Sequence, residues 1–315
     1  SYSVFDGTSF AHELRMCDVK RLFVGGLATD YCVVNTALAD YSPDEAVELE
    51  QMPPLERFIL HRLWELDGQV RTAYEGYLFQ DVIRPVTEFC QNELSALFFD
   101  IRKDALYCDR PDSIRRRAAR TVMDAVFERL TAWLAPLIPF TMEEAWTTRY
   151  PEAHSNCLRV IPDTPAEWRN DAEAARWAKV QAVTKSVTAT LELWRRDKRI
   201  GSALDANVTA WVKDATAVDA FVDLDAAEVF RTSQAKVLPY GVENVKASVA
   251  ALSNPVGMFD EDPVVTGVEV LEIPKCARSW RRVPDVGSDP RYPDLSLRDA
   301  DAVAAWDATH RKALA

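Results

Sequence analysis

The sequence lacks any run of about eighteen apolar residues, so it predicts no membrane-spanning helix. No basic and apolar leader opens the chain, and we therefore expect no secretory signal. The 6 cysteines lie far apart and include no Cys-x-x-Cys pair, a pattern that is typical of a reducing compartment and not of a disulfide framework. Together these absences predict a cytoplasmic protein with no membrane partner.

Positive charge is in deficit, because 37 Lys and Arg residues stand against 49 Asp and Glu residues and the formal net charge is -12. This balance argues against non-specific binding of nucleic acid, which depends on neutralising phosphates. The basic residues nevertheless gather in three sequence clusters, at 115–120, 195–199 and 278–282. A chain that is acidic overall can still bind nucleic acid through one basic face.

Helical periodicity is clearest between residues 50 and 146. Two prolines suit the first turn of a long helix, whose apolar stripe runs from Leu55 to Tyr77. A second helix is expected over 81–103, and a third ends before Pro136, which removes a helical donor. The third helix carries apolar residues at spacings of three and four, namely Ala118, Ala119, Val122, Val126, Leu130 and Trp133. The pattern predicts an antiparallel helical bundle.

Another long helix is expected to begin at Pro165 and to end at Gly201, because glycine commonly closes helices. Its acidic residues come early and its basic residues come late, which complements the helix dipole. From Asn207 the sequence alternates between apolar and polar residues. This alternation predicts short strands in a small α+β domain.

Three phrases are more specific than their periodicity: FFDIRKDALYCD at 98–109, LAPLIPFTMEEAW at 134–146 and KRIGSALDA at 198–206. The first two closely resemble the anticodon-binding helical domain of class I aminoacyl-tRNA synthetases, among which isoleucyl-tRNA synthetases fit best. The third resembles the element that follows this bundle in the same enzymes, with Asp205 in place of the usual glutamate.

This resemblance covers residues 41–315 and implies a mainly α fold. The expected parts are an anticodon-binding helical bundle at 41–163, a long helix with a small α+β domain at 164–274, and a degenerate zinc-ribbon-like tail at 275–315. The resemblance also implies tRNA(Ile) as the partner. The catalytic half of the synthetase is missing from the sequence, and we expect a monomer.

Anticodon recognition of this kind implies a particular set of side chains. Unstacked bases are read by aromatic and arginine planes, while lysine and arginine contact phosphates. For each candidate the alternative is a solvated helix face or an intrahelical ion pair, and for the tryptophan it is packing inside the tail. The candidates, chosen by their place in the motifs and basic clusters, are Arg102, Lys103, Arg115, Arg116, Lys198, Arg199, Arg278, Trp280 and Arg282.

The tail departs from the family pattern at its metal site. Many isoleucyl-tRNA synthetases end in a zinc ribbon with four thiolates in two Cys-x-x-Cys pairs. The corresponding positions here are Cys276, Ser279, Ser296 and Asp299. One thiolate of four remains, and serine is a poor zinc ligand. We therefore predict no zinc and no other cofactor.

Residues 1–40 follow a different pattern. The phrases SYSVFDGT and VGGLATDYCVVNTAL resemble nicotinamidases of the isochorismatase-like hydrolase superfamily, and the resemblance places Cys32 at the nucleophile position. A βα fragment is expected here, with a helix beginning near Cys32. The segments that carry the aspartate base, the lysine and the metal site of that family are absent. We therefore expect a chimera in which Cys32 marks a vestigial catalytic position.

Three classes of function stay open at this point. The first is the anticodon-binding part of an isoleucyl-tRNA synthetase. The second is an enzyme, but the HIGH and KMSKS motifs of the ligase do not occur and the amidase is incomplete, so no free-standing activity is expected. The third is a structural helical module without a ligand, against which the arginine clusters argue weakly.

The chain is expected to release no ammonia from nicotinamide. Amide hydrolysis by a thiolate needs a base and a group that stabilises the oxyanion, and no motif supplies either beside Cys32. An ammonia assay on the purified chain measures this, with iodoacetamide labelling of Cys32 as a measure of its exposure. Ammonia release that disappears in a Cys32→Ala variant would contradict the expectation.

Overall fold

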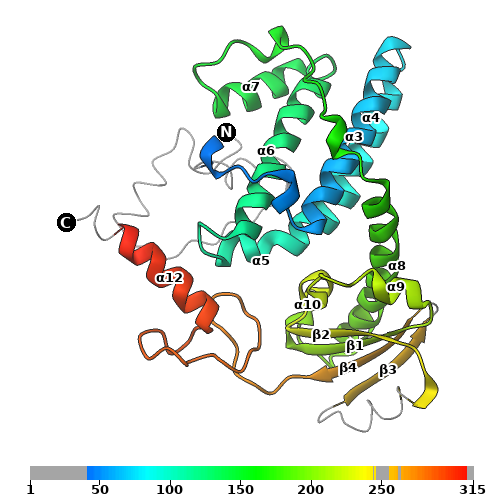
Figure 1. Cartoon of the computed structure of the whole chain (residues 1–315), viewed down its shortest axis with the longest axis vertical. Coiled ribbons are helices and arrows are strands. Elements are labelled where there is room, and N and C mark those ends of the chain that lie inside the picture. Colours follow the sequence, from blue (N-terminus) through cyan, green and yellow to red (C-terminus); the bar gives the residue numbers. More distant parts are fainter. Residues whose placement is uncertain (1–40, 244, 246–254, 262–263, 311–315) are drawn as a thin grey trace. The chain divides into compact units, whose positions relative to one another are not determined.

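The computed structural model describes residues 41–243, 245, 255–261 and 264–310 (Figure 1). The expected βα fragment over 1–40, with Cys32, lies outside the described residues and stays a prediction. Contacts divide the described chain into two units. The first holds residues 41–102 and 112–170, and the second holds residues 103–111 and 171–310.

The first unit is a helical bundle that also contains several short 3-10 turns. Proline opens its first long helix because the missing N–H is not needed in a first turn. The elements are η2 (Pro43–Glu45), η3 (Leu49–Gln51), α3 (Pro54–Glu75), α4 (Gln80–Glu88), the π-helix η4 (Phe89–Phe99), the start of α5 (Asp100–Cys108), α6 (Ile114–Leu134), α7 (Pro139–Arg149), η5 (Asn156–Leu158) and η6 (Ala166–Trp168).

The core of the bundle lies between the apolar stripes of its long helices. On α3 the residues predicted from periodicity are buried as far as Ala73, and on α6 all six of the predicted apolar residues are buried. The stripe does not extend to Tyr77, which is 80% exposed. The helix has already ended at Glu75, and Tyr77 takes a left-handed conformation with φ 55° in the turn that follows.

The second long helix widens in its middle. Residues 80–108 form one continuous helical run in which Phe89–Phe99 is a π-helix, with more residues in each turn than an α-helix has. The apolar stripe follows this change, because Phe89 and Leu94 are both buried although they are five residues apart. The wider turn also buries consecutive residues, Phe98 and Phe99.

Buried polar groups fasten the bundle at two levels. Arg102 donates from Nε and Nη2 to the Glu56 carboxylate at 2.6 and 2.7 Å, and the two side chains are 5% and 0% exposed. Further along α3, Asp67 accepts from Trp133 Nε1 at 3.0 Å and from Arg71 Nε at 2.8 Å. Both carboxylates are thus paired inside the bundle, which sets how α3 meets its neighbours.

The second unit joins one long helix to a four-stranded sheet. Helix α8 spans Asp171–Arg196, which is shorter than the expected span from Pro165 to Gly201 because η6 and a turn occupy the two ends. The remaining elements are η7 (Ala203–Asp205), β1 (Ala206–Val212), α9 (Ala215–Asp219), α10 (Ala226–Phe230), β2 (Gln234–Pro239), β3 (Pro255–Glu261), β4 (Val264–Val270) and α12 (Leu297–His310).

The sheet has the order β2-β1-β4-β3 (Figure 1). β1 pairs in parallel with β2 after a crossover through α9 and α10, and it pairs antiparallel with β4. Helix α8 packs against β1 and β4. Trp211 is fully buried and its ring requires Gly267, because a Cβ there would lie 2.8 Å from the ring. The strands thus form the expected small α+β layer on which α8 rests.

In the part of the chain that the structure describes, no helix is long and apolar enough to cross a membrane.

Replacing Arg102 by alanine is expected to lower the free energy of unfolding by about 3–5 kcal/mol, because the Glu56 carboxylate is then left buried without its partner. The adjacent exposed Lys103 provides a matched control, and Lys103→Ala is expected to change stability by less than about 0.5 kcal/mol. Urea unfolding of the two variants measures the difference. Equal losses in both would contradict the structural role of Arg102.

Candidate nucleic-acid interface

The end of α8 is closed by a Schellman motif. The amide of Arg199 donates to the carbonyl of Trp194 at 2.9 Å, and the amide of Lys198 donates to the carbonyl of Arg195 at 3.0 Å. This pairing requires a left-handed backbone at Lys198, whose φ is 58°. Glycine is usual at this position because a side chain costs about 1–2 kcal/mol. Backbone exceptions of this kind cluster at functional sites.

This turn, residues 195–199 and here called the α8 turn, gathers positive charge at the surface. Its four exposed cations are Arg195, Arg196, Lys198 and Arg199. Glu192 pairs with Arg195 at 2.6 Å, and Asp197 lies 3.8 Å from Arg196, both on the surface. Lys198 pairs with no carboxylate among the described residues. Exposed ion pairs contribute little to stability, so these cations can exchange their carboxylates for phosphates at small cost.

An ion pair connects Asp205, which follows the α8 turn along the chain, to the tail. Gly201 approaches Asp205 so closely that a Cβ built on it would lie 3.1 Å from Oδ2. Asp205 Oδ1 accepts from Arg282 Nε at 2.8 Å, and Arg282 also donates to the Ile273 carbonyl at 3.0 Å. Its amide donates to Ser233 Oγ at 2.7 Å. Asp205, which follows the α8 turn along the chain, is therefore paired with a cation of the tail turn.

The tail turn, residues 275–282, presents an aromatic ring to solvent. A bridge between Lys275 and Arg282 closes the turn, and the Trp280 amide donates to the Cys276 carbonyl at 2.9 Å. Trp280 is 55% exposed and has a left-handed backbone with φ 62°. The Lys275 ammonium lies 5.7 Å from the centroid of its ring. An exposed indole beside a cation is a platform on which a base can stack.

The segment 103–111 is fastened to the tail through Arg278. This arginine donates from Nη2 to the Tyr107 carbonyl at 2.7 Å and from Nη1 to the Cys108 carbonyl. Its guanidinium is therefore used for structure. Lys103, at the start of the segment, is exposed.

A buried carboxylate holds the tail from inside. Burial alone acts to raise the pKa of Asp299. The charge of Arg298 and the hydrogen bonds from Cys276, Ser279 and Ser296 outweigh burial and keep the pKa below its usual value. Asp299 is therefore ionised at neutral pH.

The sequence candidates thus separate into surface groups and structural groups. Arg102 is buried against Glu56, and Arg278 and Arg282 make internal hydrogen bonds. Arg115 and Arg116 lie half-buried on α6 in the first unit. The candidates that the second unit exposes are Lys103, Lys198, Arg199 and Trp280.

Sequence reasoning missed three contributors to this region. Arg195 and Arg196 are exposed beside Lys198, and the signal for them was present because they belong to the same basic cluster. Asp205, which pairs with Arg282 of the tail turn, stands in the KRIGSALDA phrase. Its role as an ion-pair partner had no signal in the sequence, because Arg282 lies far along the chain.

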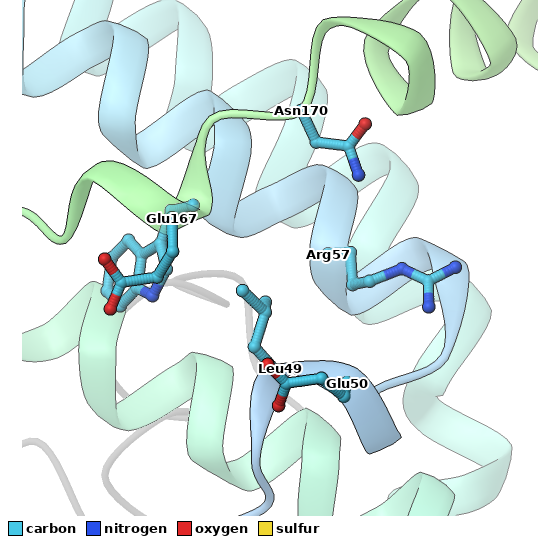
Figure 2. Close-up of a pocket in the computed structure, with 6 residues that line it drawn as sticks. Leu49, Glu50, Arg57, Glu167 and Asn170 are labelled. Atoms are coloured by element: carbon cyan, nitrogen blue, oxygen red, sulfur yellow. The ribbon is translucent and has the colours of Figure 1, made fainter.

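The first unit contains a hollow of a different character (Figure 2). Its lining comes from η3, the start of α3 and the η6 segment, and it includes Glu50, Glu167 and Arg57. Two carboxylates beside one guanidinium do not favour a phosphate. No group of His, Cys, Asp and Glu side chains suited to a metal ion occurs within the described ranges.

Residues 56–210 match the family model of the anticodon-binding domain of tRNA ligase. An isoleucine–tRNA ligase of Caulobacter vibrioides is 58% identical over 277 residues, which is 86% of this chain and 27% of that protein. The corresponding ligase of Brucella abortus is 47% identical over 82% of this chain and 26% of its own length. The ligase of Bartonella henselae is 45% identical over 84% of this chain and 27% of its own length.

The chain belongs to the tRNA ligase family, as the anticodon-binding region of an isoleucine–tRNA ligase. It spans about a quarter of the length of the curated relatives that it matches. This confirms the family assigned from the FFDIRKDALYCD and LAPLIPFTMEEAW phrases, and the helical bundle agrees with it. The matched family model ends at Ala210 in β1, so it includes the α8 turn and Asp205, while the tail turn lies beyond it.

Cys108 is expected to resist alkylation, in contrast to Cys157. Burial and the charges of Asp104 and Asp299 raise the pKa of the Cys108 thiol to about 12, whereas Cys157 is exposed. The thiolate is the reactive form, so a raised pKa keeps Cys108 protonated and unreactive at pH 8.

Iodoacetamide labelling followed by peptide mass spectrometry is expected to give a rate at Cys108 on the order of a hundredfold below that at Cys157. The rate at Cys108 should rise only as the pH approaches 12. Comparable labelling of both cysteines at pH 8 in the folded chain would contradict this environment.

Proposed function

We propose that this chain binds the anticodon region of tRNA(Ile) and supplies the recognition step of an isoleucyl-tRNA synthetase, acting in the cytoplasm where tRNA is charged. The HIGH and KMSKS motifs do not occur in its sequence, so amino-acid activation belongs to a catalytic half outside this sequence. In this proposal the chain acts as a monomer on one tRNA.

One observation carries the proposal. Lys198 and Trp280 are both exposed and both held in left-handed backbone conformations, and Asp205, which follows the α8 turn along the chain, forms an ion pair with Arg282 of the tail turn. A cation on one turn and an aromatic plane on the other are the two elements that single-stranded nucleic acid requires. The cation neutralises a phosphate, and the ring stacks on an unpaired base.

The strained turns also argue for a rigid presentation. Each backbone is fixed by hydrogen bonds between main-chain groups, at Arg199 and Lys198 in one turn and at Trp280 in the other. Ligand binding therefore has less backbone entropy to remove than it would in an open loop. Such pre-organisation suits recognition of a splayed anticodon.

The charge of the whole chain limits the affinity. With a net charge of -12, long-range attraction to tRNA is weak, so binding must depend on local groups of exposed cations such as the α8 turn. We expect a dissociation constant on the order of micromolar, with strong salt dependence.

The other classes of function are not favoured. The family match covers residues 56–210, and the relatives reported above are isoleucine–tRNA ligases and not amidases. A structural module without a ligand does not explain why four exposed cations gather at the α8 turn of an acidic chain.

The variant Lys198→Glu is expected to weaken binding of tRNA(Ile) roughly tenfold and to lower the slope of log K against log salt by about 0.7–0.9, one phosphate contact. Trp280→Ala is expected to weaken binding by about 1–3 kcal/mol with an unchanged salt slope, because stacking is not ionic. Lys236→Glu is the matched control, an exposed charge reversal on β2.

Fluorescence anisotropy with labelled tRNA(Ile), titrated at several salt concentrations, measures affinity and slope together. If Lys236→Glu lowers the affinity as much as Lys198→Glu does, net charge alone explains the loss, and a local site is contradicted. Equal binding of an unrelated tRNA at moderate salt would remove the anticodon specificity.

A further inference from the structure

One oxygen atom in the tail is the meeting point of three side chains. Asp299 Oδ2 accepts hydrogen bonds from Cys276 Sγ at 3.1 Å, from Ser279 Oγ at 2.8 Å and from Ser296 Oγ at 2.8 Å. The Asp299 side chain is 0% exposed. These four residues are the positions at which related ribbons are expected to carry zinc thiolates. The four positions therefore converge in space, although only one of them, Cys276, carries a thiol.

Positive charge surrounds the same carboxylate. Arg278 Nη1 lies 3.3 Å from Asp299 Oδ1, and Arg298 Nη2 lies 3.3 Å from both oxygens. The Ser296 amide donates to Cys276 Sγ at 3.4 Å, and the Asp299 amide donates to Ser296 Oγ at 3.3 Å. The carboxylate thus links the tail turn, the residue before α12 and the first turn of α12 itself.

The residues present do not fit a zinc ion. Zinc–sulfur bonds measure about 2.3 Å, and structural sites use four strong ligands. Here there is one thiol and two hydroxyls, and all three donate protons to an oxygen at hydrogen-bond distances. One thiolate and one carboxylate would only neutralise Zn²⁺. Arg278 would then face a neutral centre in place of an anion, and Arg298 would keep only Asp104 and Asp109.

We propose that the Asp299 carboxylate replaces the metal as the cross-link of this tail, so that the turn carrying Trp280 folds without any metal ion. The charges are reversed relative to those of a zinc site. A buried anion collects three proton donors and two guanidiniums in place of a cation that collects anionic sulfurs. Charge-assisted hydrogen bonds of this kind are the strong ones in proteins, and several together offset the cost of burying the carboxylate.

This assignment makes Asp299 a positioning residue for the proposed interface. The tail turn begins one residue before Cys276 and contains Ser279, which is adjacent to Trp280. Loss of the carboxylate removes the acceptor of both Cys276 and Ser279, the two donors that belong to the tail turn. An asparagine amide at position 299 has the same shape as the carboxylate. Its NH₂ group is a donor, however, and it would face side chains that also donate.

The first test compares Asp299→Asn with the matched control Asp301→Asn in the full 315-residue chain. Asp301 lies on the same helix and is exposed, so the control removes the same charge without the network. Hydrogen exchange should accelerate at least tenfold at the Cys276 and Trp280 amides in Asp299→Asn alone. Wild-type chain treated with a chelator should keep its protection, and elemental analysis should find no stoichiometric zinc.

Three results would overturn the proposal. They are one zinc per wild-type chain, loss of protection on chelation, and equal exchange in the two variants. Because hydrogen exchange reports on the tail locally, these results are independent of tRNA affinity and do not depend on the proposed function.

A gain-of-metal variant gives a second test. The combination Ser279→Cys, Ser296→Cys and Asp299→Cys returns four thiols to the converging positions while Arg278 and Arg298 still face a net anionic centre. Cobalt titration is expected to give the absorption bands of a tetrahedral thiolate site at one ion per chain, with none in wild type. A folded triple variant that binds no cobalt would overturn the shared centre. If the variant does not fold, the comparison of Asp299→Asn with Asp301→Asn decides.

Discussion

The buried carboxylate of Asp299 is the constraint on which the tail depends. Three side-chain donors and two guanidiniums converge on it, and the two segments that bring them are far apart in the sequence. Through Arg278 the same network reaches the carbonyls of Tyr107 and Cys108. The exposed ring of Trp280 is therefore placed by a cluster whose central carboxylate is fully buried.

Arginine has two separate duties in this chain, and burial distinguishes them. Arg102 is buried and paired with Glu56, where removing one partner leaves a charge uncompensated, and the half-buried Arg298 pairs with Asp104, Asp109 and Asp299. Arg195 and Arg196 have only exposed partners, which water and salt screen. The first group holds the fold, and the second group is available to a polyanion. An acidic chain can thus carry a local basic site without being basic.

The sequence by itself determined the helices of the bundle and the family. Apolar spacing placed the buried faces of α3 and α6 because periodicity is a local property of helix geometry. One regular helix was expected over 81–103, and the π-helix at Phe89–Phe99 within it was not. The ends of helices were predicted less well from the sequence. Gly201 was expected to end α8, but Lys198 takes the left-handed position because hydrogen bonds of the turn impose it.

Only the tertiary structure decided which charged residues face solvent. Arg102 and Lys103 are neighbours in one phrase, yet one is buried against Glu56 and the other is exposed. The same holds for Asp205, which pairs with Arg282 of the tail turn, and for Asp299, two of whose donors come from 20 and 23 residues upstream. Electrostatic energy depends on distance in space and on burial, and neither quantity is contained in the order of residues along the chain.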